Sequence, residues 1–319
     1  MDRKTAKVLG GTLVAFALVV GACSGVSTDD PPDQPLQIVV TTTVLGDIVS
    51  QIVGDQASVE TIIPNGVDPH EFQPSSRQVA AIATADLVIV NGLGLEEGLL
   101  DVVSSAESDG TRVLRIGELV DPLPFDRKGG SCTVPADGSS AVGDCDPHAW
   151  MDPLRMLDAS VGIGGALASI DPTTDWATGV DAYVDVLEQL DAEVEAIVAT
   201  IPQQKRLLVS NHDALGYFAA RYGFEIVGTV IPGGSTLADP SSSELENLVT
   251  LIDGLGVPAV FAETQSSKAL AEAVAREAGR DVAVIELYTG SLGPEGSGAE
   301  TYVGMIRADA QLIVDGLGG

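Results

Sequence analysis

Apolar and polar positions along the chain follow two different spacings. Short runs rich in Val and Ile, such as 86–90, are typical of parallel strands buried on both faces, and apolar positions three and four residues apart predict helices. The predicted strands cover 38–41, 59–63, 86–90, 112–116, 206–210, 224–229, 258–263 and 281–287. The predicted helices cover 44–53, 75–85, 95–106, 153–170, 174–200, 213–222, 241–255, 266–278 and 300–316.

One predicted helix stands out by its length and position. Residues 174–200 carry apolar side chains at helical spacing with Asp and Glu between them, and Pro202 follows. This helix separates two groups of four alternating strands and helices. We therefore predict an α/β fold with two lobes, each a four-stranded parallel sheet flanked by helices, joined by one long rigid helix. The lobes cover 36–172 and 202–319, and the linking helix lies within 173–201.

The first 22 residues are predicted to be a signal peptide. A basic start, from Arg3 to Lys7, precedes an apolar stretch at 8–20 that is short for a membrane span. Small residues then precede Cys23, which resembles a bacterial lipobox and implies cleavage before Cys23 and a lipid on its sulfur. Ordinary cleavage nearby, with an incidental cysteine, is the alternative. Residues 23–35 have few apolar side chains and are predicted to be a disordered tether.

Composition narrows the range of partners. The formal net charge is −30, which argues against a nucleic acid because such partners require basic surface. A negative field attracts cations instead. Hydrophobic residues make up 45% of the chain and aromatic residues only 4%, so the cores must consist of Val, Ile, Leu and Ala.

Two of the three cysteines form a candidate pair. With Cys23 assigned to the lipid, Cys132 and Cys145 remain in a Gly-, Ser- and Pro-rich loop at 122–146. An exported protein favours a disulfide between them, and free thiols or a metal-binding pair are the alternatives.

All three histidines of the chain occupy similar positions. His70, His148 and His212 each lie between a predicted strand and a predicted helix, and the first two follow Asp-Pro. Loops at the carboxyl ends of parallel strands face a common ligand-binding cleft, so the three side chains are expected to meet there. Three imidazoles suit a divalent cation, above all zinc. For each histidine taken alone, the alternative is a local role in its own turn.

Several motifs together resemble one protein family. The motifs are Asp-Pro-His-Glu-Phe at 68–72, Asp-Pro-His-Ala-Trp-Met-Asp-Pro at 146–153, Ser-Asn-His-Asp-Ala-Leu-Gly-Tyr-Phe at 210–218, Phe-Ala-Glu-Thr-Gln at 261–265 and Leu-Tyr-Thr-Gly-Ser-Leu-Gly-Pro at 287–294. Their content and order resemble those of the zinc and manganese solute-binding proteins of bacterial ABC importers, the cluster A-I family. The resemblance implies a metal held between the lobes and delivered to a membrane permease. It also implies a lipid anchor on the outer face of the cytoplasmic membrane. We further expect a monomer.

The resemblance implies that His70, His148 and His212 are the metal ligands. Manganese members usually carry a carboxylate where His212 stands, so the histidine favours zinc, with manganese as the alternative. The loop before His148 lacks the histidines common in zinc members and offers Asp137, Asp144 and Asp146 instead.

The resemblance also points to a missing fourth ligand. The family's aspartate in Thr-Asp-Ser is replaced here by Gly290. Water, Glu263 or Glu295 could then complete the coordination, unless Gly290 only serves a tight turn.

Two other functions remain open at this point. Three histidines and a water can form a catalytic zinc site, which makes a zinc-dependent hydrolase or hydratase the main competitor. The chain has no Gly-x-Ser-x-Gly and no His-Glu-x-x-His motif, so we expect no enzyme. A surface adhesin is a third alternative with no specific support in the sequence.

Overall fold

The computed structural model describes residues 35–125, 132 and 145–318. Residues 35–319 form one compact unit. The predicted signal peptide, Cys23 and nearly all of the tether lie outside the described residues. No helix in the described part of the chain is long and apolar enough to cross a membrane.

The first lobe is built on a sheet of four parallel strands. Its strands are β1 (Leu36–Val40), β2 (Ala57–Thr61), β3 (Leu87–Val90) and β4 (Val113–Arg115), in the order β2-β1-β3-β4. The helices of this part are α1 (Thr43–Val53), α2 (Ser76–Thr84) and α3 (Leu100–Ser108), with 3-10 turns η1 (Gly54–Gln56), η2 (Glu97–Leu99) and η3 (Ile116–Glu118). All four residues of β3 are buried, as expected for a strand covered on both faces.

The second lobe repeats this topology. Its parallel strands are β5 (Leu207–Ser210), β6 (Glu225–Thr229), β7 (Ala259–Glu263) and β8 (Ala283–Leu287), in the order β6-β5-β7-β8. Its other elements are η5 (Gln203–Lys205), α6 (Gly216–Tyr222), α7 (Ser242–Leu255), α8 (Ala269–Glu277) and α9 (Tyr302–Gly316). A capping box between Ser241 and Glu244 starts α7, and a left-handed Gly223 ends α6. The predicted two-lobed α/β fold is confirmed.

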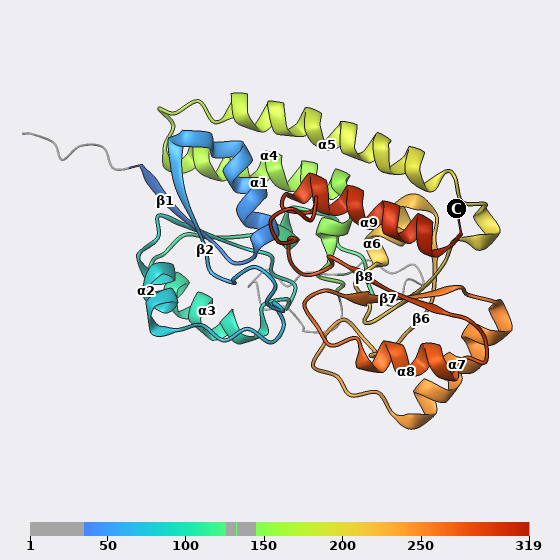
Figure 1. The fold of residues 1–319 in the computed structure, drawn as a ribbon. Coiled ribbons are helices and arrows are strands. Elements are labelled where there is room, and N and C mark those ends of the chain that lie inside the picture. Colours follow the sequence, from blue (N-terminus) through green and yellow to red (C-terminus); the bar gives the residue numbers. More distant parts are fainter. Residues whose placement is uncertain (1–34, 126–131, 133–144, 319) are drawn as a thin grey trace, which may run out of the picture. The chain divides into compact units, whose positions relative to one another are not determined.

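A layer of helices connects the two lobes. The 22-residue α5 (Ala177–Val198), about 33 Å long at ~1.5 Å per residue, runs beside α4 (Pro153–Ile170) and also contacts α1 and α9 (Figure 1). The 3-10 turn η4 (Ala149–Met151) leads into α4, whose first residue is Pro153 and whose cap is Asp152. The largest apolar core includes side chains of both lobes beneath these helices, and it fixes the bases of the loops that carry the histidines.

Several helices begin later than the sequence pattern predicts, and two of these delays matter for the site. The helix predicted at 95–106 begins at Leu100, because Glu96 has a non-helical backbone and residues 97–99 form the 3-10 turn η2 instead. The helix predicted at 213–222 begins at Gly216, because Ala214 N donates to His212 O in a tight turn. Both irregular segments belong to loops near the histidines.

Candidate metal centre

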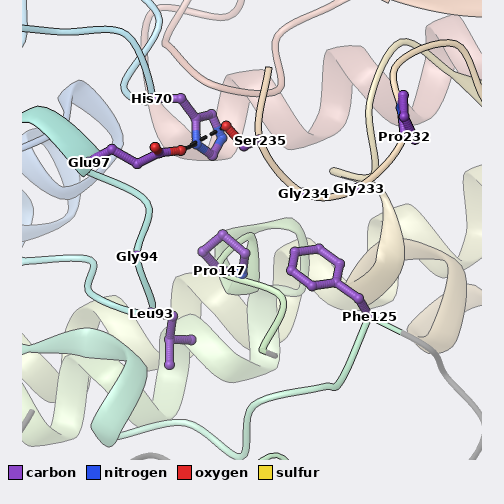
Figure 2. Close-up of a pocket in the computed structure, with 10 residues that line it drawn as sticks. All are labelled: His70, Leu93, Gly94, Glu97, Phe125, Pro147, Pro232, Gly233, Gly234 and Ser235. Atoms are coloured by element: carbon purple, nitrogen blue, oxygen red, sulfur yellow. Dashed lines mark hydrogen bonds and ion pairs between the residues drawn. The ribbon is translucent and has the colours of Figure 1, made fainter. Parts of the chain in front are cut away.

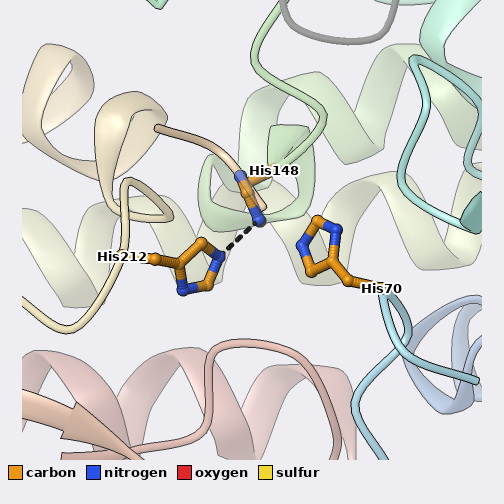
Figure 3. A group of neighbouring side chains, drawn as sticks. All are labelled: His70, His148 and His212. Carbon is orange, nitrogen blue, oxygen red and sulfur yellow. Dashed lines mark hydrogen bonds between the residues drawn. The ribbon is translucent and has the colours of Figure 1, made fainter. Parts of the chain in front are cut away.

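The structure brings together all three of the histidines singled out by the sequence (Figure 3). His70 comes from the loop between β2 and α2, His148 directly precedes η4, and His212 lies between β5 and α6. One ligand nitrogen from each ring lies within 4.8 Å of the other two, and all three side chains are buried. Residues more than 140 positions apart in the sequence thus form one polar cluster.

The geometry is close to that of a tetrahedral metal site. Nε2 of His148 and Nε2 of His212 are 3.0 Å apart, and the ring centroid of His70 is 5.6 and 5.5 Å from those of His148 and His212. Zinc–nitrogen bonds of roughly 2.0–2.1 Å in a tetrahedron require nitrogens about 3.3 Å apart. A cation therefore needs only a small approach by His70 and a slight separation of the other two rings.

The repeated Asp-Pro-His sequence explains how two of the rings are placed. Oδ1 of Asp68 accepts a hydrogen bond from His70 N at 2.9 Å, and Oδ1 of Asp146 accepts one from His148 N, also at 2.9 Å. In each case the aspartate side chain caps the backbone turn that directs its histidine towards the other two rings. The third turn is different, because there the hydroxyl of Ser210 donates to the carbonyl oxygen of His212 at 2.7 Å.

Carboxylates lie behind two of the three rings. Nδ1 of His148 is 2.8 Å from Oδ1 of Asp146, and Nδ1 of His212 is 2.5 Å from Oε1 of Glu263. A carboxylate on Nδ1 fixes the tautomer that leaves Nε2 free to bind a cation, and it raises the basicity of the ring. Asp146 and Glu263 were predicted only as possible ligands, and their role behind the rings was not predicted from the sequence.

Burial and neighbouring charges set the protonation of the site. Burial, together with the proximity of His148 and His212, lowers the pKa of His70 to about 2, so this ring is neutral. Burial opposes the charged form of His212, but the nearby Glu263 outweighs it and the pKa of His212 is raised. Burial likewise opposes ionisation of Glu263, whose pKa is nevertheless lowered by His212. The centre therefore provides a neutral ring at His70, and at His212 a ring whose positive charge, from a proton or from a bound cation, is offset by Glu263.

No carboxylate joins the three ligand nitrogens in the described part of the chain. Glu263 lies behind His212 rather than among the ligand atoms, and Glu295 is exposed on its loop. Neither residue therefore occupies the fourth position in this conformation. Asp137 and Asp144 lie outside the described residues, and Asp146 is the partner of His148.

A side chain placed at position 290 would meet Gln265. A Cβ added to Gly290 would be 2.7 Å from Nε2 of Gln265 and 3.2 Å from Cδ of Pro69. Gly290 is not among the glycines with positive φ, so its backbone does not require a glycine. The amide of Gln265, which donates to Oγ1 of Thr289 at 3.1 Å, occupies this space instead.

The two remaining cysteines are bonded to each other in the structure. The Cα atoms of Cys132 and Cys145 are 5.5 Å apart, and Cys145 directly precedes Asp146. Cys145 also forms an isolated antiparallel bridge with Pro124. The disulfide and this bridge therefore fix the position of Cys145, three residues before His148.

Comparison with known proteins places the chain in a family. Residues 38–316 match the family of the zinc-uptake complex component A, periplasmic. The chain is 32% identical over 308 residues to a manganese-binding lipoprotein, MntA, of Halalkalibacterium halodurans, with 96% of each chain covered. It is 27% identical to an iron ABC transporter substrate-binding lipoprotein, MtsA, of Streptococcus pyogenes, with 99% of each covered. The periplasmic zinc-binding protein TroA of Treponema pallidum has a similar structure, with a TM-score of 0.77 at 28% identity over 89% of this chain and 99% of that one.

The two matching lobes, the helix between them and the buried histidine cluster define a metal-binding solute-binding protein of the ABC-transporter type. The chain belongs to the family of the zinc-uptake complex component A. Its relatives are substrate-binding proteins of transporters and not enzymes, so the hydrolase alternative is set aside.

Proposed function

We propose that this protein captures zinc outside the cytoplasmic membrane and delivers it to the permease of an ABC importer, with His70, His148 and His212 as ligands. The observation that carries the proposal is the convergence of three buried imidazoles, with no carboxylate of the described residues among the ligand atoms. Imidazole suits zinc better than manganese, which prefers oxygen ligands. The names of the relatives include manganese, iron and zinc, so the donor set of this chain is the main argument for the metal.

The proposal includes attachment to the membrane through Cys23. The relatives are named as lipoproteins, and the cysteine follows an apolar stretch and small residues. The chain would then remain on the outer face of the membrane, close to the permease. Radiolabelled palmitate should be incorporated into the full chain and not into its Cys23→Ser variant. Equal labelling of both would contradict the anchor.

Metal competition tests the choice of cation. The full chain, extracted from membranes in detergent and stripped with a chelator, is exposed to equimolar zinc, manganese and ferrous iron. One zinc per chain is expected by elemental analysis after removal of free metal. A preference for manganese or iron would overturn the proposed selectivity.

Single substitutions test the three ligands. The variants His70→Ala, His148→Ala and His212→Ala should each bind zinc at least about tenfold more weakly, since water must replace the lost ligand. The ring of Trp150 packs 5.2 Å from that of His148 and provides a fluorescence signal near the site. Unchanged affinity in His148→Ala would contradict the ligand assignment, and Gln189→Ala, on exposed helix surface, is the control.

A further inference from the structure

His70 differs from the other two histidines in its surroundings. Its side chain is only 3% exposed, yet neither ring nitrogen has a hydrogen-bond partner among the described residues. One nitrogen faces His148 and His212, and the other points away from them (Figure 3). His148 and His212 each have a carboxylate within 2.8 Å of Nδ1. His70 is thus a buried ring whose outer nitrogen lacks the short contact that the other two rings have.

Among the described residues, the acid within ion-pair distance of that nitrogen is Glu97. Oε1 of Glu97 lies 3.8 Å from Nδ1 of His70, and both residues line a pocket of about 170 Å³ (Figure 2). Among the ten described residues that line this pocket, Glu97 is the only acidic one. The same Oε1 accepts a hydrogen bond from Oγ of Ser235 at 2.7 Å. Glu97 belongs to the first lobe and Ser235 to the second, so this bond joins the lobes beside the metal centre.

We propose that Glu97 is the positioning residue for His70: when a cation binds, Oε1 accepts a hydrogen bond from Nδ1–H, and Ser235 holds the carboxylate from the opposite lobe. This inference rests on the proposed function. The oxygen can accept from both donors, because a carboxylate oxygen has two lone pairs. Closing the 3.8 Å gap by about 1 Å gives a normal charge-assisted hydrogen bond. Because His70 itself moves towards the cation, the carboxylate of Glu97 has to follow it, which its partly exposed side chain allows.

The proposed contact gives all three rings the same arrangement. Asp146, Glu263 and Glu97 would each hold one Nδ1–H and direct one Nε2 to the cation. The three carboxylates differ in exposure, since Asp146 and Glu263 are almost fully buried and the side chain of Glu97 is 27% exposed. Water therefore competes with His70 for the carboxylate of Glu97, but it does not reach the carboxylates of Asp146 and Glu263. His70 is consequently the ligand whose orientation is held least tightly, and the first that can release a cation towards the pocket.

The test compares two variants of Glu97 with a control elsewhere. Glu97→Ala removes the acceptor, and Glu97→Gln removes the charge but keeps an oxygen that can accept from Nδ1–H. Glu246→Ala removes the same charge from an exposed position on α7. In zinc competition titrations of the full chain, we expect about tenfold weaker binding for Glu97→Ala, at most about threefold for Glu97→Gln, and no change for Glu246→Ala. Ser235→Ala should cause a smaller loss than Glu97→Ala, because the carboxylate remains.

A spectroscopic measurement separates positioning from a general structural effect. Ring nitrogen-15 NMR of the three histidines in the zinc-loaded chain should show a protonated, slowly exchanging Nδ1 for His70, and faster exchange in Glu97→Ala. Wild-type affinity in Glu97→Ala, equal losses in the alanine and glutamine variants, or zinc on Nδ1 of His70 would each overturn the inference. Failure of the wild-type chain to bind zinc would instead overturn the proposed function.

Discussion

Oε1 of Glu263 lies 2.5 Å from Nδ1 of His212, while Nε2 of the same ring lies 3.0 Å from Nε2 of His148. The carboxylate and the cation site are therefore on opposite sides of one imidazole. Glu263 is almost completely buried, so it acts on the cation through His212 rather than by direct contact.

Substitution of Glu263 should weaken zinc binding without abolishing it. Glu263→Gln keeps the size of the side chain but removes the charge that raises the pKa of His212. We expect roughly tenfold weaker binding in a competition titration, a smaller loss than in His212→Ala. Glu286→Gln, an exposed acid of β8 paired with Lys268, is the control. A loss as large as that of His212→Ala would mean that Glu263 is itself a ligand.

Restoring a carboxylate at position 290 should strengthen the site once room is made for it. Because a Cβ at Gly290 would lie 2.7 Å from Nε2 of Gln265, the informative variant combines Gly290→Asp with Gln265→Ala. A fourth oxygen ligand should raise zinc affinity and improve the relative binding of manganese. Gln265→Ala alone is the control. Unchanged or weaker binding of both metals by the folded double variant would refute the idea that a ligand is missing at Gly290.

The pair Cys132 and Cys145 should be oxidised in exported protein. Non-reducing mass spectrometry is expected to find a peptide linked through these two residues. The chain-entropy relation gives roughly 3 kcal/mol for closing a loop of this length, and the effect should be local because the bridge spans only 13 positions. The double variant Cys132→Ser and Cys145→Ser should therefore unfold at a lower temperature. Free thiols at both positions in exported protein would contradict the prediction.

The regular parts of the fold could be predicted from the sequence. Strand β3 is a four-residue apolar run buried on all sides, and α4 begins at Pro153 and ends just before Asp171, as the pattern indicates. Such elements are encoded locally, by periodicity, caps and breakers. The two parallel sheets could be predicted because strands that alternate with helices leave few other arrangements, whereas the order of the strands within each sheet was not predicted.

The surroundings of the site could only be predicted in part. His70, His148 and His212 were found because their local contexts repeat, but the capping of two of these turns by Asp68 and Asp146 was not predicted. The partner relationship between His212 and Glu263 joins residues 51 positions apart and has no local pattern. The same holds for Glu97, whose contact with Ser235 depends on how the two lobes meet.

Asp309 should make the stability of the protein depend on pH. This residue of α9 is completely buried, its Oδ1 accepts from Tyr288 N at 2.9 Å, and its Oδ2 has no hydrogen-bond partner in the described chain. Burial raises the pKa of Asp309 to about 7, despite the hydrogen bond from Tyr288. Between about pH 4 and pH 7 the unfolded chain loses this proton and the folded chain keeps it. Stability contributed by the neutral form is therefore present at low pH and is lost as the pH rises to about 7.

The variant Asp309→Asn should remove most of this dependence, because an amide is neutral at every pH in this range. Above pH 7 the variant should be more stable than the wild type by a few kcal/mol, on the order of 1.4 kcal/mol for each pH unit between the two pKa values. The difference should shrink steadily towards pH 4. Thermal unfolding of the metal-free proteins at several pH values measures it, with Asp315→Asn, an exposed aspartate of the same helix, as the control. The stability gained from the amide can grow with pH only if the folded chain holds a proton on Asp309 that the unfolded chain has lost. A stability difference that stays constant between pH 4.5 and pH 8 would therefore show that Asp309 does not titrate in this window.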